Sequence, residues 1–208
     1  YEGLFSIIII LIIIGLLNNW QEILSDNSSF IIINFIIAAS LSSTGTMIYI
    51  FSLSKTSIGI ALTVCAAVNV LTASSYDYVI NSISFDIFFF FGASLIIISI
   101  FILNIKSFLI KSKINSLGVF GAILTGFLWG SAVFFNDKAL IESNIFTASI
   151  IRSLTAMVVM FTTSIIISKK INIIDDFKLY KLFLITVILL FLSNIIWFVS
   201  LEYTTGSL

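Results

Sequence analysis

The sequence predicts an all-α protein that crosses a membrane several times. Of its 208 residues, 60% are hydrophobic and only 10% are charged, whereas a soluble domain carries about 25% charged residues. A soluble fold of this size could not bury so much apolar surface, so a lipid bilayer is the expected solvent. The apolar stretches are hydrophobic on all sides and show no period of two, which favours helices over barrel strands.

Seven stretches reach or approach the roughly 17–25 apolar residues that a transmembrane helix needs. The expected spans are Leu4–Leu17, Phe30–Phe51, Ile58–Ser74, Ile83–Leu103, Leu117–Phe135, Ile145–Ser168 and Leu179–Val199. The first is short, the chain begins without Met, and it stops just after an apolar stretch. We therefore expect the sequence to be part of a longer membrane protein.

The few charged residues exclude several classes of protein. Ten Lys and Arg balance ten Asp and Glu, so no basic field exists to attract nucleic acid. Histidine is absent and Cys65 is the only cysteine, which removes the commonest metal ligands and the usual general base. No Asp/Glu pair lies inside a span, so we expect neither an enzyme, nor a metal site, nor a cofactor.

The positive charges divide unequally between the two membrane faces. One face holds only Lys138 and Arg152, whereas the loops of the other face hold eight lysines: Lys55, Lys106, Lys111, Lys113, Lys169, Lys170, Lys178 and Lys181. Short loops rich in Lys and Arg remain in the cytoplasm. This distribution predicts a multi-pass protein of the cytoplasmic (plasma) membrane with the lysine-rich face inside.

An internal repeat relates the two ends of the sequence. Residues 49–59 align with residues 197–207 at an offset of 148, with Ser, Leu and Thr identical at 52/200, 53/201 and 56/204. The same offset superposes the edges of the spans. The loop after Ser168 is rich in lysine, but the equivalent loop at 21–29 has no cation. Charge reverses between the copies, as expected for the inverted repeats of transporters.

Several motifs resemble those of the EamA-type drug/metabolite transporter superfamily. Gly118–Leu140, with its Trp129-Gly130 pair, resembles the first helix of that family's repeat, and Arg152 matches an arginine of the second helix. Ser52–Ala61 is similar to the turn between the third and fourth helices, and Phe91–Ile100 to the start of the fifth. Family members place the mid-chain loop outside, whereas the lysines here place residues 104–116 inside.

The resemblance implies ten helices in two inverted five-helix repeats, of which seven are visible in this sequence. Residues 1–114 would hold helices two to five of the first repeat. Residues 115–208 would hold helices one to three of the second repeat. The family's activity implies a secondary transporter of small metabolites, an exporter, that works by alternating access between the two repeats.

Polar and aromatic residues inside the spans are the candidates for a substrate pathway. They are Asn34, Asn69, Asp86, Trp129, Arg152 and Asn194. Arg152 and Asp86 are expected to pair or to face a water-filled vestibule, with Arg152 offering a fixed charge to an anionic group of the substrate. Each candidate also has a structural alternative: the amides can join helices, the tryptophan can anchor at the interface, and Arg152 and Asp86 can snorkel to the headgroups. Gly121, Gly126 and Gly130 are expected to permit close helix packing.

Two other function classes share parts of this sequence pattern. A flippase or polymerase for lipid-linked polysaccharide has a similar composition but would lack the 148-residue inverted repeat. A seven-helix retinal protein needs a lysine in the middle of its last helix, and Lys181 lies at the edge of that span. No nucleotide-binding loop is present. The expected partners are a small-molecule substrate and the lipid bilayer, with no nucleic acid, and a homodimer is left open.

Overall fold

Five long helices make up most of the part of the chain that the structure describes. The computed structural model describes residues 28–80, 87–109, 116–141 and 143–168, with shorter pieces at 7–9, 11–12, 15, 181, 185–186, 188–189, 192–197 and 199–200. The helices are α3 (Ser29–Lys55), α4 (Ile58–Val79), α5 (Ile87–Leu109), α6 (Ser116–Leu140) and α7 (Ile145–Ser168). Within these described residues every regular element is a helix, and no strand is present.

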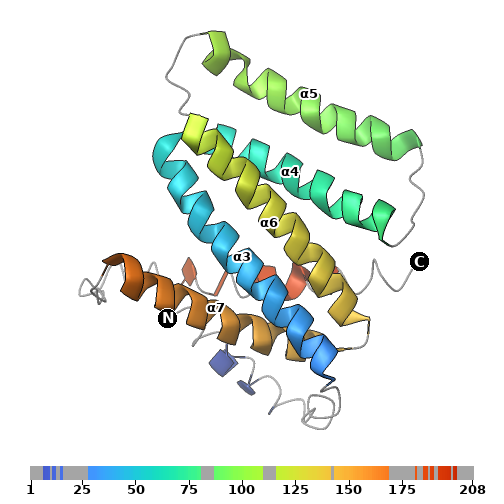
Figure 1. The fold of residues 1–208 in the computed structure, drawn as a ribbon, viewed down its shortest axis with the longest axis vertical. Coiled ribbons are helices and arrows are strands. Elements are labelled where there is room, and N and C mark those ends of the chain that lie inside the picture. The colour runs from blue at the N-terminus through green and yellow to red at the C-terminus, as the bar shows by residue number, and fades with distance from the viewer. Residues whose placement is uncertain are drawn as a thin grey trace. The chain divides into compact units, whose positions relative to one another are not determined.

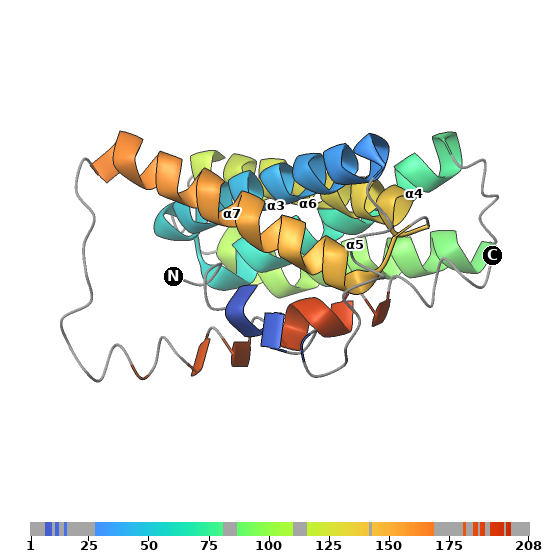
Figure 2. The same cartoon turned by 90° about the horizontal axis from the view of Figure 1, so that it is seen from below.

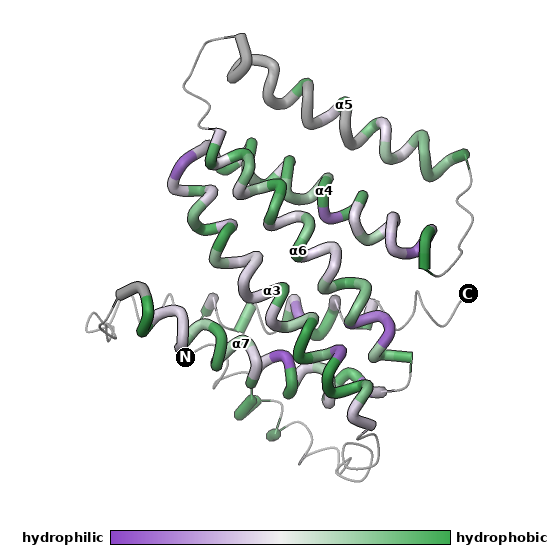
Figure 3. The backbone as a smooth tube through the Cα atoms, viewed as in Figure 1, coloured by the Kyte–Doolittle hydropathy of each residue, from purple (hydrophilic) through white to green (hydrophobic). Residues whose placement is uncertain are grey.

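The helices identify the chain as a multi-pass helical membrane protein. In the part of the chain that the structure describes, four segments are long and apolar enough to cross a bilayer: Ser29–Lys55, Ile58–Val79, Ser116–Leu140 and Ile145–Ile166. Helix α5 has 23 residues, of which only Lys106 is charged. In Figure 3 the described helices are hydrophobic over most of their length, with few and separated hydrophilic positions. The all-helical membrane fold predicted from composition is confirmed at this level.

Several helices are longer than the apolar stretches that predicted them. Helix α3 ends at Lys55 rather than Phe51, and α4 ends at Val79 rather than Ser74. A helix continues into its polar ends because each backbone N–H and C=O leaving the bilayer still needs a hydrogen-bond partner. The described residues of the first and last predicted spans are also helical.

Side chains cap the beginnings of three helices. The Ser57 hydroxyl oxygen accepts from the Ile60 N–H at 3.4 Å at the start of α4. The Asn144 side-chain oxygen accepts from the Thr147 N–H at 2.9 Å at the start of α7, and Ser28 caps α3 in the same way. Each cap satisfies one of the backbone donors that a helix leaves unpaired at its first turn.

The chain forms two compact units, each with its own core. The first unit comprises Tyr1–Ser40 and Phe135–Leu208, and the second comprises Leu41–Phe134. The buried core of the first unit consists of Ile31, Phe35, Ala139, Leu140 and Ala148. In the second unit Tyr49, Leu53, Val64 and Trp129 pack around buried Ala61, Cys65 and Ala122.

Within the second unit, α6 lies between α3 and α4, and α5 packs along α4 (Figures 1 and 2). The order of contacts gives the relative directions of the helices. Trp129 meets Ser42 and Gly118 meets Ser52, so α6 runs antiparallel to α3. Gly126 lies against Cys65, and Ser131 lies farther along against Tyr76, so α6 runs parallel to α4. Consecutive membrane crossings must alternate in direction, and these contacts obey that alternation.

Candidate functional site

Glycines let α6 approach α3 closely in the second unit. A Cβ atom added at Gly121 would lie 3.2 Å from the Ser52 Cβ, and one at Gly118 would lie 2.9 Å from the Thr56 Cβ. The Ser52 hydroxyl is fully buried and donates to the Gly118 carbonyl oxygen at 2.5 Å. Small residues permit such backbone approach in membrane proteins, where a polar bond between helices contributes about 0.6 kcal/mol on average.

The opposite side of α6 packs against α4 even more tightly. A Cβ at Gly126 would lie 2.5 Å from the Cys65 carbonyl oxygen and 3.0 Å from the Asn69 backbone nitrogen. A Cβ at Gly130 would lie 2.6 Å from the Thr72 Cβ and 2.7 Å from the Asn69 carbonyl oxygen. Because the neighbours include backbone atoms, neither position has room for a side chain.

Trp129 lies on the α3 side of α6, where it contacts the backbone of α3 and a second aromatic ring. Its indole Nε1 donates to the Ser42 carbonyl oxygen at 3.2 Å, and its ring centroid lies 5.5 Å from that of Tyr49. A Cβ at Gly45 would lie 2.7 Å from the Trp129 Cδ1. One turn earlier, the buried Thr125 hydroxyl lies 3.2 Å from the Gly45 carbonyl oxygen. Glycine on α3 therefore makes the space that the indole fills.

Asn69 holds a buried hydrogen-bond acceptor near the middle of α4. It lies about 17 Å along the helix from Ile58, given a rise of 1.5 Å per residue in a helix that spans Ile58–Val79. Its side-chain Oδ1 is buried and has no hydrogen-bond partner in the described part of the chain. Leaving such an atom unpaired costs about 1–3 kcal/mol. Asn69 therefore lowers the stability of the folded protein unless another molecule donates a hydrogen bond to its Oδ1.

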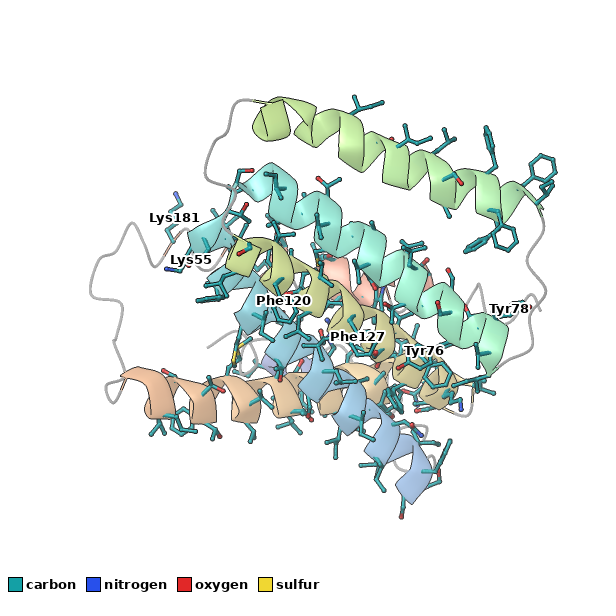
Figure 4. The ribbon with its side chains drawn as sticks, turned by 45° about the horizontal axis from the view of Figure 1, so that its top comes forward. Lys55, Tyr76, Tyr78, Phe120, Phe127 and Lys181 are labelled. Atoms are coloured by element: carbon teal, nitrogen blue, oxygen red, sulfur yellow. The ribbon has the colours of Figure 1, made fainter. Side chains whose placement is uncertain are left out.

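Tyr76 is a contact residue that the sequence did not single out. Its hydroxyl lies 3.3 Å from the Ser131 hydroxyl, and its ring stacks on Phe134 with centroids 4.6 Å apart and planes at 17°. Figure 4 shows Tyr76 directed towards α6, whereas Tyr78 lies at the end of α4 and is 61% exposed. In the sequence, the only indication of this contact is the presence of two tyrosines, Tyr76 and Tyr78, two residues apart. Their spacing does not show which of the two faces α6.

In the first unit, Asn34 is buried but bonded within its own helix. It is 7% exposed, and its Nδ2 donates to the Phe30 carbonyl oxygen at 2.9 Å. Both residues belong to α3, so this bond does not join α3 to another helix. Asn194 is half-buried on the described segment 192–197.

Arg152 contacts an aromatic ring in the first unit. Its guanidinium carbon lies 5.2 Å from the centre of the Trp197 ring, which is a cation–π distance. The predicted alternative partner, Asp86, lies outside the described residues. Trp197 is the first residue of the repeated segment 197–207, but nothing in the sequence indicates its contact with Arg152.

Three buried hydroxyls at or just before the start of α7 have no hydrogen-bond partner among the described residues: those of Ser143, Thr147 and Ser149. Thr147 is 4% exposed and Ser149 is 5% exposed. Buried polar groups are nearly always bonded to protein or to another molecule. The sequence gives no signal for these sites, because serine and threonine are common in helices and only their burial sets these apart.

The structure thus separates the candidate residues into two groups. Asn69 and Trp129 belong to the second unit, while Asn34, Arg152 and Asn194 belong to the first.

Among the residues described, no group of three or more His, Cys, Asp or Glu side chains could hold a metal ion. Comparisons of the chain with protein-family models, with curated proteins and with solved structures gave no match.

Proposed function

We propose that the protein is a secondary transporter that moves small metabolites out of the cell through the plasma membrane. The observation that carries the proposal is the Asn69 Oδ1 atom, which is buried near the middle of a membrane-crossing helix without a hydrogen-bond partner among the described residues. Transporters bind their substrates near the bilayer midplane with polar groups of this kind. An amide kept only to join helices would have its oxygen bonded.

The charge pattern and the internal repeat supply the mechanism. In this proposal the chain contributes seven of ten helices, and the lipid bilayer is its solvent. The two inverted repeats, with their boundary at residue 114, rock against each other around a central site. The direction of α6 relative to α3 and α4 supports the alternating crossings that such a repeat needs.

The substrate path in the second unit is built from neutral groups. The amide of Asn69 offers a hydrogen bond, and the indole of Trp129 and the ring of Tyr49 offer aromatic surface. Glycines at 126 and 130 hold α6 against the same part of α4. The resemblance to EamA-type transporters agrees with this arrangement, since Trp129-Gly130 is one of the residue pairs that carry it.

A metabolite-efflux screen tests the proposal. Cells expressing the complete gene that encodes this chain are compared with cells carrying an empty vector, and metabolites released to the medium are measured. We expect at least one small metabolite to accumulate outside only in the expressing cells. Release of lipid-linked polysaccharide products alone would favour the flippase class instead, and an unchanged medium would count against transport.

A further inference from the structure

Asn69 lies on the side of α4 that packs against α6. A Cβ atom added at Gly126 would lie 3.0 Å from the Asn69 backbone nitrogen, and one added at Gly130 would lie 2.7 Å from the Asn69 carbonyl oxygen. The side-chain Oδ1 is buried and has no hydrogen-bond partner in the part of the chain that the structure describes. The chemistry of this atom therefore determines which groups can bind there.

The Asn69 Oδ1 atom cannot be satisfied within its own helix in the way that hydroxyls are. The hydroxyls of Thr63 and Ser75 on α4 donate to the backbone carbonyl oxygens of Gly59 and Leu71, four residues earlier. An amide oxygen accepts and does not donate, and the backbone N–H groups in the interior of a helix are already bonded to carbonyl oxygens. The Oδ1 atom therefore requires an N–H or O–H group from outside the helix.

The four helices α3 to α6 carry their charges at their ends, whereas Asn69 lies near the middle of α4. Each charged residue is among the last four residues of its helix; these residues are Lys55, Asp77, Lys106, Asp137 and Lys138. On α4 itself, Asp77 lies about 12 Å along the helix from Asn69, given a rise of 1.5 Å per residue. A charge inside a bilayer is expensive unless it is paired, and a charged group bound beside Asn69 would find no counterion at that level of these four helices.

We propose that the Asn69 site selects neutral, largely apolar metabolites that donate an N–H or O–H hydrogen bond. The Oδ1 atom accepts that bond, and the rings of Trp129 and Tyr49 give apolar surface to the rest of the molecule. Both rings pack against the buried cluster that contains Cys65, one turn before Asn69 on α4. Indoles and phenols have this chemistry. Organic acids, protonated amines and zwitterionic amino acids are excluded because each brings a formal charge.

This inference names a substrate class for the proposed transporter and rests on that function, but binding can be measured without transport. The complete protein is reconstituted in lipid nanodiscs, and binding is measured by equilibrium dialysis with empty nanodiscs as the background. Two matched pairs of probes are compared. Indole and 1-methylindole differ in the N–H donor, and indole-3-acetamide and indole-3-acetate differ in charge.

We expect the wild type to bind indole about fivefold more tightly than 1-methylindole, because the methyl group removes one hydrogen bond between neutral groups. Indole-3-acetamide should bind more than tenfold more tightly than indole-3-acetate, because the carboxylate has no counterion there. Asn69→Leu should bind indole and 1-methylindole equally. Ser75→Ala, which removes an exposed α4 hydroxyl bonded to Leu71, should keep the wild-type preference.

Several outcomes would overturn the inference, and the first two need no variant. Equal binding of indole and 1-methylindole to the wild type would show that no acceptor is offered, and tighter binding of the acetate would favour the anionic substrate expected from Arg152. A preference for indole that persists in Asn69→Leu would place the acceptor elsewhere. Donor-selective binding in a protein that exports no metabolite would overturn the transport proposal alone, whereas export of charged metabolites only would overturn this substrate class and leave transport standing.

Discussion

Replacing Gly126 by alanine should destabilise the packing of α6 against α4. The added Cβ would lie 2.5 Å from the Cys65 carbonyl oxygen and 2.7 Å from the Val68 Cβ. An ordinary contact begins at 3.4 Å, so the backbones must separate by nearly an ångström. The obstructing oxygen belongs to a helix backbone and cannot rotate away. Overpacking of this kind costs about 1–3 kcal/mol.

Alanine also has a favourable effect that must be subtracted. In a helix alanine is better than glycine by about 0.5–1 kcal/mol, so the net loss of stability for Gly126→Ala should be up to about 2.5 kcal/mol. Two control variants give a graded series. A Cβ at Gly121 would approach Ser52 only to 3.2 Å, and a Cβ at Gly92 would meet nothing within 4 Å.

The assay is equilibrium unfolding of the purified protein in mixed micelles of increasing SDS content, followed by tryptophan fluorescence. We expect Gly126→Ala to have the lowest midpoint, Gly121→Ala to lie nearer the wild type, and Gly92→Ala to equal or exceed the wild type. If Gly126→Ala proved as stable as Gly92→Ala, the close approach of α6 to α4 would be refuted.

Two further changes test single contacts. Tyr76→Phe removes the hydroxyl that lies 3.3 Å from Ser131 and should cost about 0.5–1.5 kcal/mol in the same unfolding assay. A midpoint equal to that of the wild type would contradict the inward direction of Tyr76. Asn144→Ala removes the cap that accepts from the Thr147 N–H at 2.9 Å and should cost about 1 kcal/mol. Asn144→Asp, which keeps an accepting oxygen, should retain most of that stability, and a loss equal to that of alanine would argue against capping.

The helices could be predicted from the sequence because a helix that crosses a bilayer needs a run of about 20 mostly apolar residues. Helix α7 begins at Ile145 and ends at Ser168, as the apolar run predicted, since the capping Asn144 precedes it and Lys169 follows it. Helix α4 extends to Val79 because the backbone hydrogen bonds continue through polar residues that the apolar criterion leaves out.

The contacts between helices could not be predicted in the same way. The bond from Trp129 to Ser42 joins residues 87 positions apart, and nothing local in either segment selects the other. The spacing of Gly126 and Gly130 suggested one packing face, but the sequence could not show that the facing helix is α4. Nor could it show that the buried hydroxyl of Ser149 has no hydrogen-bond partner among the described residues, because burial and bonding depend on the surrounding helices. The seven spans, the inverted repeat and the boundary at 114 stay predictions.

The most direct test of the account is a paired measurement of stability and export on Asn69→Leu. Replacing an unpaired buried acceptor with an apolar side chain of similar shape is neutral or stabilising, so the unfolding midpoint should stay level or rise. Export of the metabolite found in the efflux screen should be lost, because Leu cannot bind it. Thr63→Val, which removes an α4 hydroxyl bonded to the Gly59 carbonyl oxygen, should export normally. A less stable Asn69→Leu that exports at the wild-type rate would contradict the account and make Asn69 a structural residue.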